Sequence, residues 1–181
     1  MLDKVVFTGG TSLVFPLRGF LPTVSPAFSA TTGADYQLTP RFWLQGNFAY
    51  NRHPFESRQL HPGINLQSNT ELLSVCAGGR YMLLAGEART FNPYVAAGAG
   101  FGILSQPSIT VQPGSGELTI GSRSRNLALL TAGAGLDWNV SPTLVLYVEA
   151  AYFRAWSESR FDYVPVLVGV RTYPASLLRK E

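Results

Sequence analysis

Residues 131–153 read TAGAGLDWNVSPTLVLYVEAAYF, and this stretch decides the fold. In its second half every other residue from Leu144 to Tyr152 is apolar, while the only acidic residue of that half lies on the opposite parity. A period of two with one uniformly apolar face is typical of a β-strand. The first half alternates in the same way as far as Trp138, and the Ser-Pro pair at 141–142 indicates a tight turn. The stretch therefore predicts a β-hairpin.

The same alternation recurs along the rest of the chain. It predicts eight strands, at about 5–16, 26–37, 42–52, 70–82, 92–104, 125–139, 143–156 and 161–173. Tight polar breaks join some of them, at Leu38–Pro40, Gly86–Arg89 and Val140–Pro142. Longer polar segments join the others, at Arg18–Ser25, His53–Asn69, Ser105–Arg123 and Ser157–Arg160. Short turns at one end and longer loops at the other predict an all-β protein, an eight-stranded antiparallel up-and-down transmembrane β-barrel.

The amino-acid composition is low in charge and rich in apolar residues, and a barrel accounts for both features. Of the 181 residues only 14% are charged, against roughly 25% in an ordinary soluble domain, and 46% are hydrophobic. Yet the sequence has no apolar run of about 18–20 residues that would make a membrane-spanning helix. A closed barrel satisfies every backbone group in lipid without such a run, so the apolar residues are spread over alternate positions of the strands.

Charge and cysteine content exclude other classes of protein. The high apolar content excludes disorder, and the net charge of +3, without a basic cluster, argues against nucleic-acid binding. The single cysteine, Cys76, excludes an intramolecular disulfide framework and a cysteine-caged zinc site. Cys76 falls on the inward parity, where we expect a buried and unreactive thiol.

The apolar parity of the strands is expected to face lipid. It contains Phe28, Ala30, Ala34, Leu44, Phe48, Leu73, Val75, Ala77, Val95, Ala97, Ala99, Phe101, Leu130, Ala132, Ala134, Leu136, Leu144, Leu146, Val148, Ala150, Val164, Val166, Val168 and Val170. Aromatic residues of the same parity gather near strand ends and predict two girdles at the membrane interfaces. Tyr36, Phe42, Tyr81 and Trp138 lie by the short turns, and Tyr50, Tyr152 and Phe15 lie towards the long loops.

Four segments carry a family resemblance: ADYQLTPRFWLQGNFAYNR, YVAAGAGFG, the 131–153 hairpin and YVPVLVGVRTY. Together they resemble the small bacterial outer-membrane β-barrel domain family, of OmpA-type build, over residues 5–173. The resemblance implies a single barrel domain at 1–174, a short tail at 175–181, a place in the bacterial outer membrane and lipid as a partner. The family's barrels usually end on an aromatic residue, whereas here a polar tail follows Tyr173, and the sequence shows no signal peptide.

The inward parity is expected to hold a polar network in the lumen. Its charged members are three acids and two bases: Asp35, Asp137, Glu149, Arg80 and Arg171. Neutral polar residues, Gln45 and Asn47 among them, accompany these charges. Because an unpaired buried charge is very costly, the five should pair with one another. Such a network either gates a small pore or merely fills the barrel, and an eight-stranded barrel is only just wide enough for its own side chains.

No enzymatic site is evident in the sequence. His53 and His61 are expected to be solvated in the loop 53–69, where their spacing matches no strong metal-ligand motif. No Ser–His pair on one strand points to an esterase. Gly98, Gly100 and Gly102 alternate within a strand and lack the Lys-Ser/Thr of a phosphate loop, so lumen packing explains them better. The sequence therefore predicts no catalytic activity, no cofactor and no metal.

Three functions remain open. The first is a structural, anchoring or partner-docking role, with another envelope protein or a surface polymer bound by the long loops. The second is a narrow channel for small solutes or ions. The third is a soluble, lipocalin-like barrel, in which the apolar parity would face inward around a ligand.

Overall fold

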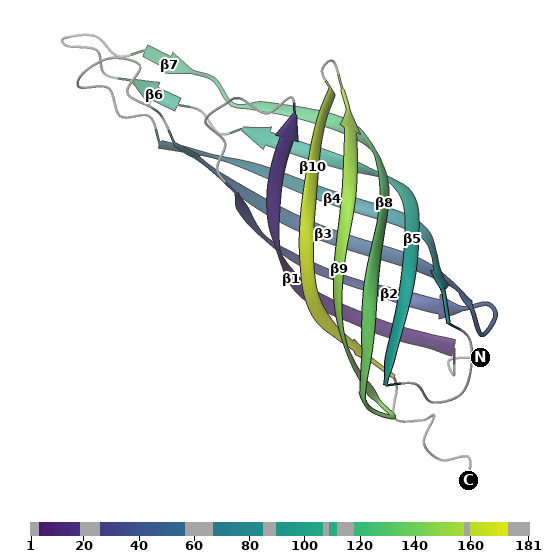
Figure 1. The fold of residues 1–181 in the computed structure, drawn as a ribbon. Coiled ribbons are helices and arrows are strands. Elements are labelled where there is room, and N and C mark those ends of the chain that lie inside the picture. Colours follow the sequence, from purple (N-terminus) through teal and green to yellow (C-terminus); the bar gives the residue numbers. More distant parts are fainter. Residues whose placement is uncertain are drawn as a thin grey trace.

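The computed structural model describes residues 4–18, 26–56, 67–84, 90–106, 109–111, 118–157 and 160–173. Eight of its strands close into an antiparallel barrel, in the order β1-β10-β9-β8-β5-β4-β3-β2 (Figure 1). Their bounds are β1 Val5–Arg18, β2 Ala27–Gln37, β3 Phe42–Glu56, β4 Gln67–Met82, β5 Phe91–Gln106, β8 Arg123–Ser141, β9 Leu144–Trp156 and β10 Arg160–Thr172. Each of these eight strands pairs with the next of the eight along the chain, and β1 closes the barrel against β10. The prediction of an eight-stranded antiparallel up-and-down barrel is thus confirmed.

The two ends of the barrel differ. The short connections lie at one end, where β1 begins and β10 ends (Figure 1). The turn between β2 and β3 is closed locally, because Leu38 N and Thr39 N donate to Phe42 O, and Phe42 N donates back to Thr39 Oγ1 at 3.0 Å. We call this the short-turn end and the opposite one the long-loop end. The expected turn at Gly86–Arg89 lies outside the described residues.

At the long-loop end the structure corrects three expectations. The segment 105–123, expected to be a loop, contains a separate two-stranded sheet of β6 (Ile109–Val111) and β7 (Leu118–Ile120). β3 and β4 extend past their expected limits and stay paired as far as Glu56 and Gln67. His53 therefore lies inside β3 on the inward parity and is only 1% exposed, not solvated in a loop. His61 lies outside the described residues.

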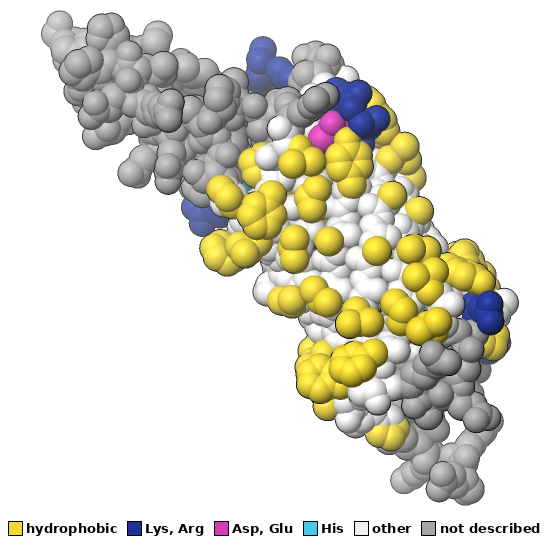
Figure 2. Space-filling model, in the orientation of Figure 1, with side chains coloured by type: hydrophobic (Ala, Val, Ile, Leu, Met, Phe, Trp, Pro, Cys, Tyr) yellow, Lys and Arg dark blue, Asp and Glu magenta, His cyan; other side chains and the backbone are white. Residues whose placement is uncertain are grey.

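The outer surface of the barrel is apolar. Phe28 and Phe101 are 76% and 78% exposed. On the face that Figure 2 shows, apolar side chains lie scattered over the wall between the two ends of the barrel. The lipocalin-like alternative required the apolar parity to face inward, and the structure places it outward. Within the described residues no helix is long and apolar enough to cross a membrane.

Candidate functional site in the barrel lumen

Four charged side chains meet inside the barrel near the short-turn end. They come from every second strand around the barrel: Asp35 from β2, Arg80 from β4, Asp137 from β8 and Arg171 from β10. Acid and base alternate, and each residue is at most 6% exposed. This set is called the ionic cluster below.

Each arginine of the ionic cluster bridges both aspartates. Arg80 Nη2 lies 3.2 Å from Asp35 Oδ2, and Arg80 Nη1 donates to Asp137 Oδ2 at 3.0 Å. Arg171 Nε lies 3.4 Å from Asp35 Oδ2, and Arg171 Nη1 donates to Asp137 Oδ1. Shared pairing of this kind compensates each buried charge twice, which offsets the cost of removing it from water.

A third acid attaches to the cluster from one side. The Tyr94 hydroxyl donates to Glu149 Oε2 at 2.8 Å and accepts from Arg171 Nη2 at 3.1 Å. The Glu149 carboxylate itself lies 4.0 Å from Arg171 Nη2. Three acids and two bases thus occupy one connected network.

Aromatic rings on the strands between the charges sandwich the two guanidinium groups. Arg80 lies over Trp43 of β3 and Tyr94 of β5, at 5.1 Å from each ring centroid. Arg171 lies 5.1 Å from the Tyr94 centroid and 3.8 Å from that of Tyr147 on β9. Cation–π contacts are stronger when the cation is desolvated, so the rings hold the arginines in place and fill the remaining width of the lumen.

Glycines in the wall make room for two of these rings. A Cβ added to Gly135 would collide with the ring of Tyr94, its partner across the β5–β8 ladder. A Cβ on Gly169 would lie 2.8 Å from the Tyr147 ring, its partner across β9–β10. The rings therefore lie flat against bare backbone, a recurrent pairing of aromatic residues with strand glycines.

Beside the network, at the mouth of the short-turn end, lies Tyr173, just past the last residue of β10. Desolvation by burial raises the pKa of its phenol, against an opposing effect of the Arg80 guanidinium. Tyr173 N also donates to Thr143 O at 3.0 Å, which ties the end of β10 to the turn before β9.

A chamber of about 90 Å³ adjoins the ionic cluster in the middle of the lumen. Its lining includes Tyr147, Glu149 and Arg171 on one side and Phe153 and Tyr163 on the other. Small apolar side chains such as Ala151 line the wall between them, together with hydroxyl and amide side chains: Thr8, Ser12, Ser29, Thr31, Gln45, Asn47, Asn51, Ser74 and Thr131. Since one water takes up about 30 Å³ in the liquid, the chamber has room for several waters.

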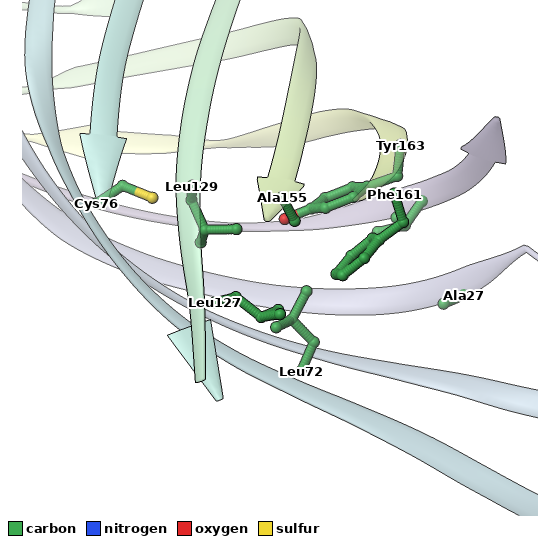
Figure 3. Close-up of a cluster of buried hydrophobic side chains, with 9 residues drawn as sticks. Ala27, Leu72, Cys76, Leu127, Leu129, Ala155, Phe161 and Tyr163 are labelled. Atoms are coloured by element: carbon green, nitrogen blue, oxygen red, sulfur yellow. The ribbon is translucent and has the colours of Figure 1, made fainter. Parts of the chain in front are cut away.

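Apolar side chains fill the lumen beyond the chamber, towards the long-loop end (Figure 3). This apolar plug consists of Val14, Ala27, Leu72, Cys76, Leu127, Leu129, Ala155, Phe161 and Tyr163. Phe153 packs against it and stacks on Tyr163 with 5.0 Å between centroids. Cys76 is buried at the border of the plug and the chamber. The chamber is thus bordered by charge pairing on one side and by apolar packing on the other.

The residues named from sequence fall into separate places in the structure. The five charges form the network just described, whereas Gln45 and Asn47 line the chamber. Of the aromatic residues assigned to the girdles, Tyr50, Tyr81 and Trp138 are exposed, while Tyr36, Phe42 and Tyr152 are half-buried. Trp43, Tyr94 and Tyr147 were not singled out, although their inward parity in the alternating pattern was the available signal.

The described lumen offers no obvious catalytic arrangement. Among the described residues, no group of three or more His, Cys, Asp or Glu side chains is placed to hold a metal ion. The carboxylates of the ionic cluster are ion-paired with guanidinium groups, although neither oxygen of Asp35 has a hydrogen-bond partner among the described residues. The arrangement is suited to closing and stabilising the lumen.

No protein-family model matches the sequence, and no curated protein matches it significantly. Solved structures do resemble it. Neisserial surface protein A is similar with a TM-score of 0.59 and 15% identity, over 93% of this chain and 96% of that one. OprG, an outer-membrane protein of Pseudomonas aeruginosa, has a TM-score of 0.59 and 12% identity, over 94% and 95%.

A third similar structure is Ail, the attachment invasion locus protein of Yersinia pestis, in complex with the heparin analogue sucrose octasulfate. Its TM-score is 0.55 and its identity 20%, over 94% of this chain and 99% of that one. At these identities the comparisons establish the fold. This chain has the fold of small eight-stranded outer-membrane barrels, in agreement with the resemblance read from its sequence.

Proposed function

We propose that this chain is an integral protein of the bacterial outer membrane that docks a surface partner through its long-loop end, with a lumen that is closed to solutes. The role is binding and anchoring rather than catalysis. One observation carries the proposal: compared with a soluble protein, the barrel is inverted, with apolar side chains outside and charged side chains inside. Large apolar side chains such as Phe101 are exposed on the wall while Arg80 and Arg171 are each 2% exposed inside.

That inversion supports a membrane location, because a soluble protein rarely exposes a contiguous apolar surface of this extent. The closed barrel leaves no unpaired sheet edge, as lipid requires. Exposed Tyr81 and Trp138 near the short turns and Tyr50 towards the long loops agree with aromatic girdles at the two interfaces.

The membrane location is tested by solubility and gel migration. The protein is expected to require detergent or lipid, to float with vesicles, and to migrate differently on a gel before and after heating. A chain that stays monomeric and soluble without detergent would contradict the proposal.

For the partner we propose an anionic surface polymer. Towards the long-loop end the described side chains include five arginines against two acids: Arg52, Arg123, Arg125, Arg154 and Arg160 against Glu71 and Asp162. Basic excess on one end attracts polyanions over long range. That Ail, with a similar fold, binds a heparin analogue supports the same class of partner here.

The polymer proposal is tested by binding of a sulfated polysaccharide to protein reconstituted in vesicles. The double variant Arg123→Gln/Arg125→Gln should bind about tenfold more weakly, the equivalent of about 1.4 kcal/mol. Arg41→Gln, at the short-turn end, should leave binding unchanged. Equal affinity of all three proteins would contradict the proposal.

The chamber in the lumen supports a second candidate, a narrow channel that opens when the ionic cluster rearranges. Conductance across planar bilayers decides between the two. A closed lumen predicts no steady current from the native protein or from the Glu149→Gln and Arg80→Gln variants. A conductance that rises steadily when either charge is removed would favour the channel.

A further inference from the structure

Two arginines share one carboxylate on the outer face of β9 and β10. Arg154 Nε donates to Asp162 Oδ1, and Arg160 Nη2 donates to Asp162 Oδ2, both at 3.2 Å. The opposite faces of both strands point into the lumen, because Ala155 and Phe161 are buried there. We call Arg154, Arg160 and Asp162 the arginine fork.

The fork is organised by its carboxylate. The Asp162 side chain is 4% exposed although it lies on the outer parity, whereas those of Arg154 and Arg160 are 34% and 49% exposed. Arg154 and Asp162 also face each other directly across the β9–β10 ladder. The acid is therefore buried, and the two guanidinium groups form the exposed part of the fork.

Tyr152 fixes Arg154 from the side of the membrane belt. Arg154 Nη2 donates to the Tyr152 hydroxyl at 2.8 Å, and the guanidinium lies 5.5 Å from the Tyr152 ring centroid. Basic and acidic side chains are seen together at the edge of the apolar belt, near the long-loop end (Figure 2). The fork is thus held rigidly just where the apolar wall ends.

Among the residues that the structure describes, the fork has charge and N–H donors left over. Two guanidinium groups and one carboxylate give a local excess of one positive charge. A guanidinium has five N–H groups, and the bonds above use two on Arg154 and one on Arg160. Planar guanidinium groups with remaining N–H donors bind phosphate oxygens in bidentate fashion.

We propose that the arginine fork binds the phosphate group of a membrane lipid in the leaflet next to the long-loop end. The position selects a lipid over a soluble phosphate, because the fork lies on the outer wall at the edge of the apolar belt, level with headgroups. This inference rests on the proposed membrane location, but it concerns the wall and not the polymer-docking loops. It assigns Asp162 the role of positioning residue.

The experiment uses the nearby Trp156, which pairs with Arg160 across the ladder, as the reporter. The protein with Trp138→Phe is reconstituted in phosphatidylcholine vesicles that contain a minor fraction of brominated phosphatidic acid, whose bromines quench nearby tryptophan fluorescence. Quenching by brominated phosphatidylcholine alone gives the reference. The remaining tryptophan, Trp43, is buried in the lumen and contributes a constant background.

Wild-type protein is expected to concentrate phosphatidic acid around Trp156 about tenfold over phosphatidylcholine, as for one charged hydrogen-bond contact. Arg154→Gln/Arg160→Gln should abolish the preference. Arg41→Gln is the matched control, because Arg41 Nη1 donates to Tyr81 OH at 3.4 Å near the opposite belt edge, and it should leave the preference intact.

The Asp162→Asn variant distinguishes lipid binding by positioned guanidinium groups from non-specific attraction of an anionic lipid by positive charge. The substitution raises the local charge, so non-specific attraction predicts more phosphatidic acid around Trp156. An organised fork predicts less, because the amide no longer holds both guanidinium groups. Heat-modifiable migration confirms that the variant is folded.

The remaining outcomes are decisive. Flotation with vesicles but no lipid preference overturns the fork and leaves the membrane location standing. Displacement of the lipid by glycerol phosphate at low concentration overturns the choice of a lipid over a soluble phosphate. Failure of the folded wild-type protein to insert at all overturns the membrane location, and the fork with it.

Discussion

The ionic cluster and the apolar plug close the same lumen by opposite means. In the ionic cluster four charges from β2, β4, β8 and β10 alternate in sign around the barrel, with rings between them. In the apolar plug, aliphatic and aromatic side chains such as Leu72 and Phe161 fill the space without any such order. One closure depends on which strand carries which residue, and the other depends mainly on volume.

This difference bears on how the barrel specifies its register. A strand that slipped by one residue would turn its buried charge to the lipid and leave the opposite charges unpaired, at a cost of several kcal/mol. The same slip in the plug would exchange one apolar residue for another at many positions. The ionic cluster therefore contributes specificity at the short-turn end, and the plug contributes burial.

The largest effect is expected from breaking the ionic cluster. Arg171→Met should lower the free energy of unfolding by about 4 kcal/mol, because it leaves Asp35, Asp137 and Glu149 in the lumen with one guanidinium among them. Denaturant unfolding of the reconstituted protein measures it. Arg41→Met, at an exposed position, should change the value by less than about 0.5 kcal/mol.

The apolar plug should respond less strongly to a single truncation. Leu129→Ala should cost about 3 kcal/mol, since the 2% exposed side chain leaves a cavity that the plug fills only in part. Its neighbour Leu130 is 50% exposed on the outer wall, and Leu130→Ala should cost less because lipid fills the space. If Leu129→Ala proved more costly than Arg171→Met, the ranking of the two closures would be wrong.

The sequence predicts which face of a strand is apolar, but it does not predict the height of a residue along the barrel axis. A period of two assigns each side chain to the lumen or to the wall, and parity alone places Asp35, Arg80, Asp137, Glu149 and Arg171 on the inward side. Height along the lumen depends on the stagger of the strands, which parity does not contain. For that reason the separation of an ionic cluster from an apolar plug was not predicted.

Two further features depended on contacts across strands. The inward parity allowed for Tyr94 and Tyr147, but their place over the guanidinium groups follows from the glycines that face them on neighbouring strands. The burial of His53 was missed because polar residues around it suggested a loop, whereas pairing with β4 continues the strand to Glu56. At His53 the pairing with a neighbouring strand therefore determines the structure, and the polar composition of the segment does not.

A third test adds volume to the wall beside the ionic cluster without removing a charge. Gly135→Ala should destabilise the barrel by about 2 kcal/mol, because the new Cβ collides with the Tyr94 ring and with the backbone of β9. Gly9→Ala is the matched control in another strand, where an added Cβ meets nothing within 4 Å. Equal unfolding free energies for the two variants would show that the rings move aside freely.

The smallest effect is expected from one hydroxyl. Tyr94→Phe keeps the ring over both arginines and removes only the bonds to Glu149 and Arg171. We expect a loss of about 1 kcal/mol in unfolding free energy, as for a typical internal hydrogen bond. Tyr81→Phe removes an exposed hydroxyl and should cost less.

A double-mutant cycle makes this last measurement specific to the network. Glu149→Gln keeps an oxygen that accepts from Tyr94 but removes the charge opposite Arg171, and the two substitutions act on groups 2.8 Å apart. Residues in one network are expected to show a coupling of about 0.5 kcal/mol or more. If the two substitutions change the unfolding free energy additively, Glu149 lies close to the cluster without contributing energetically to it. The ordered network would then consist of the four alternating charges alone.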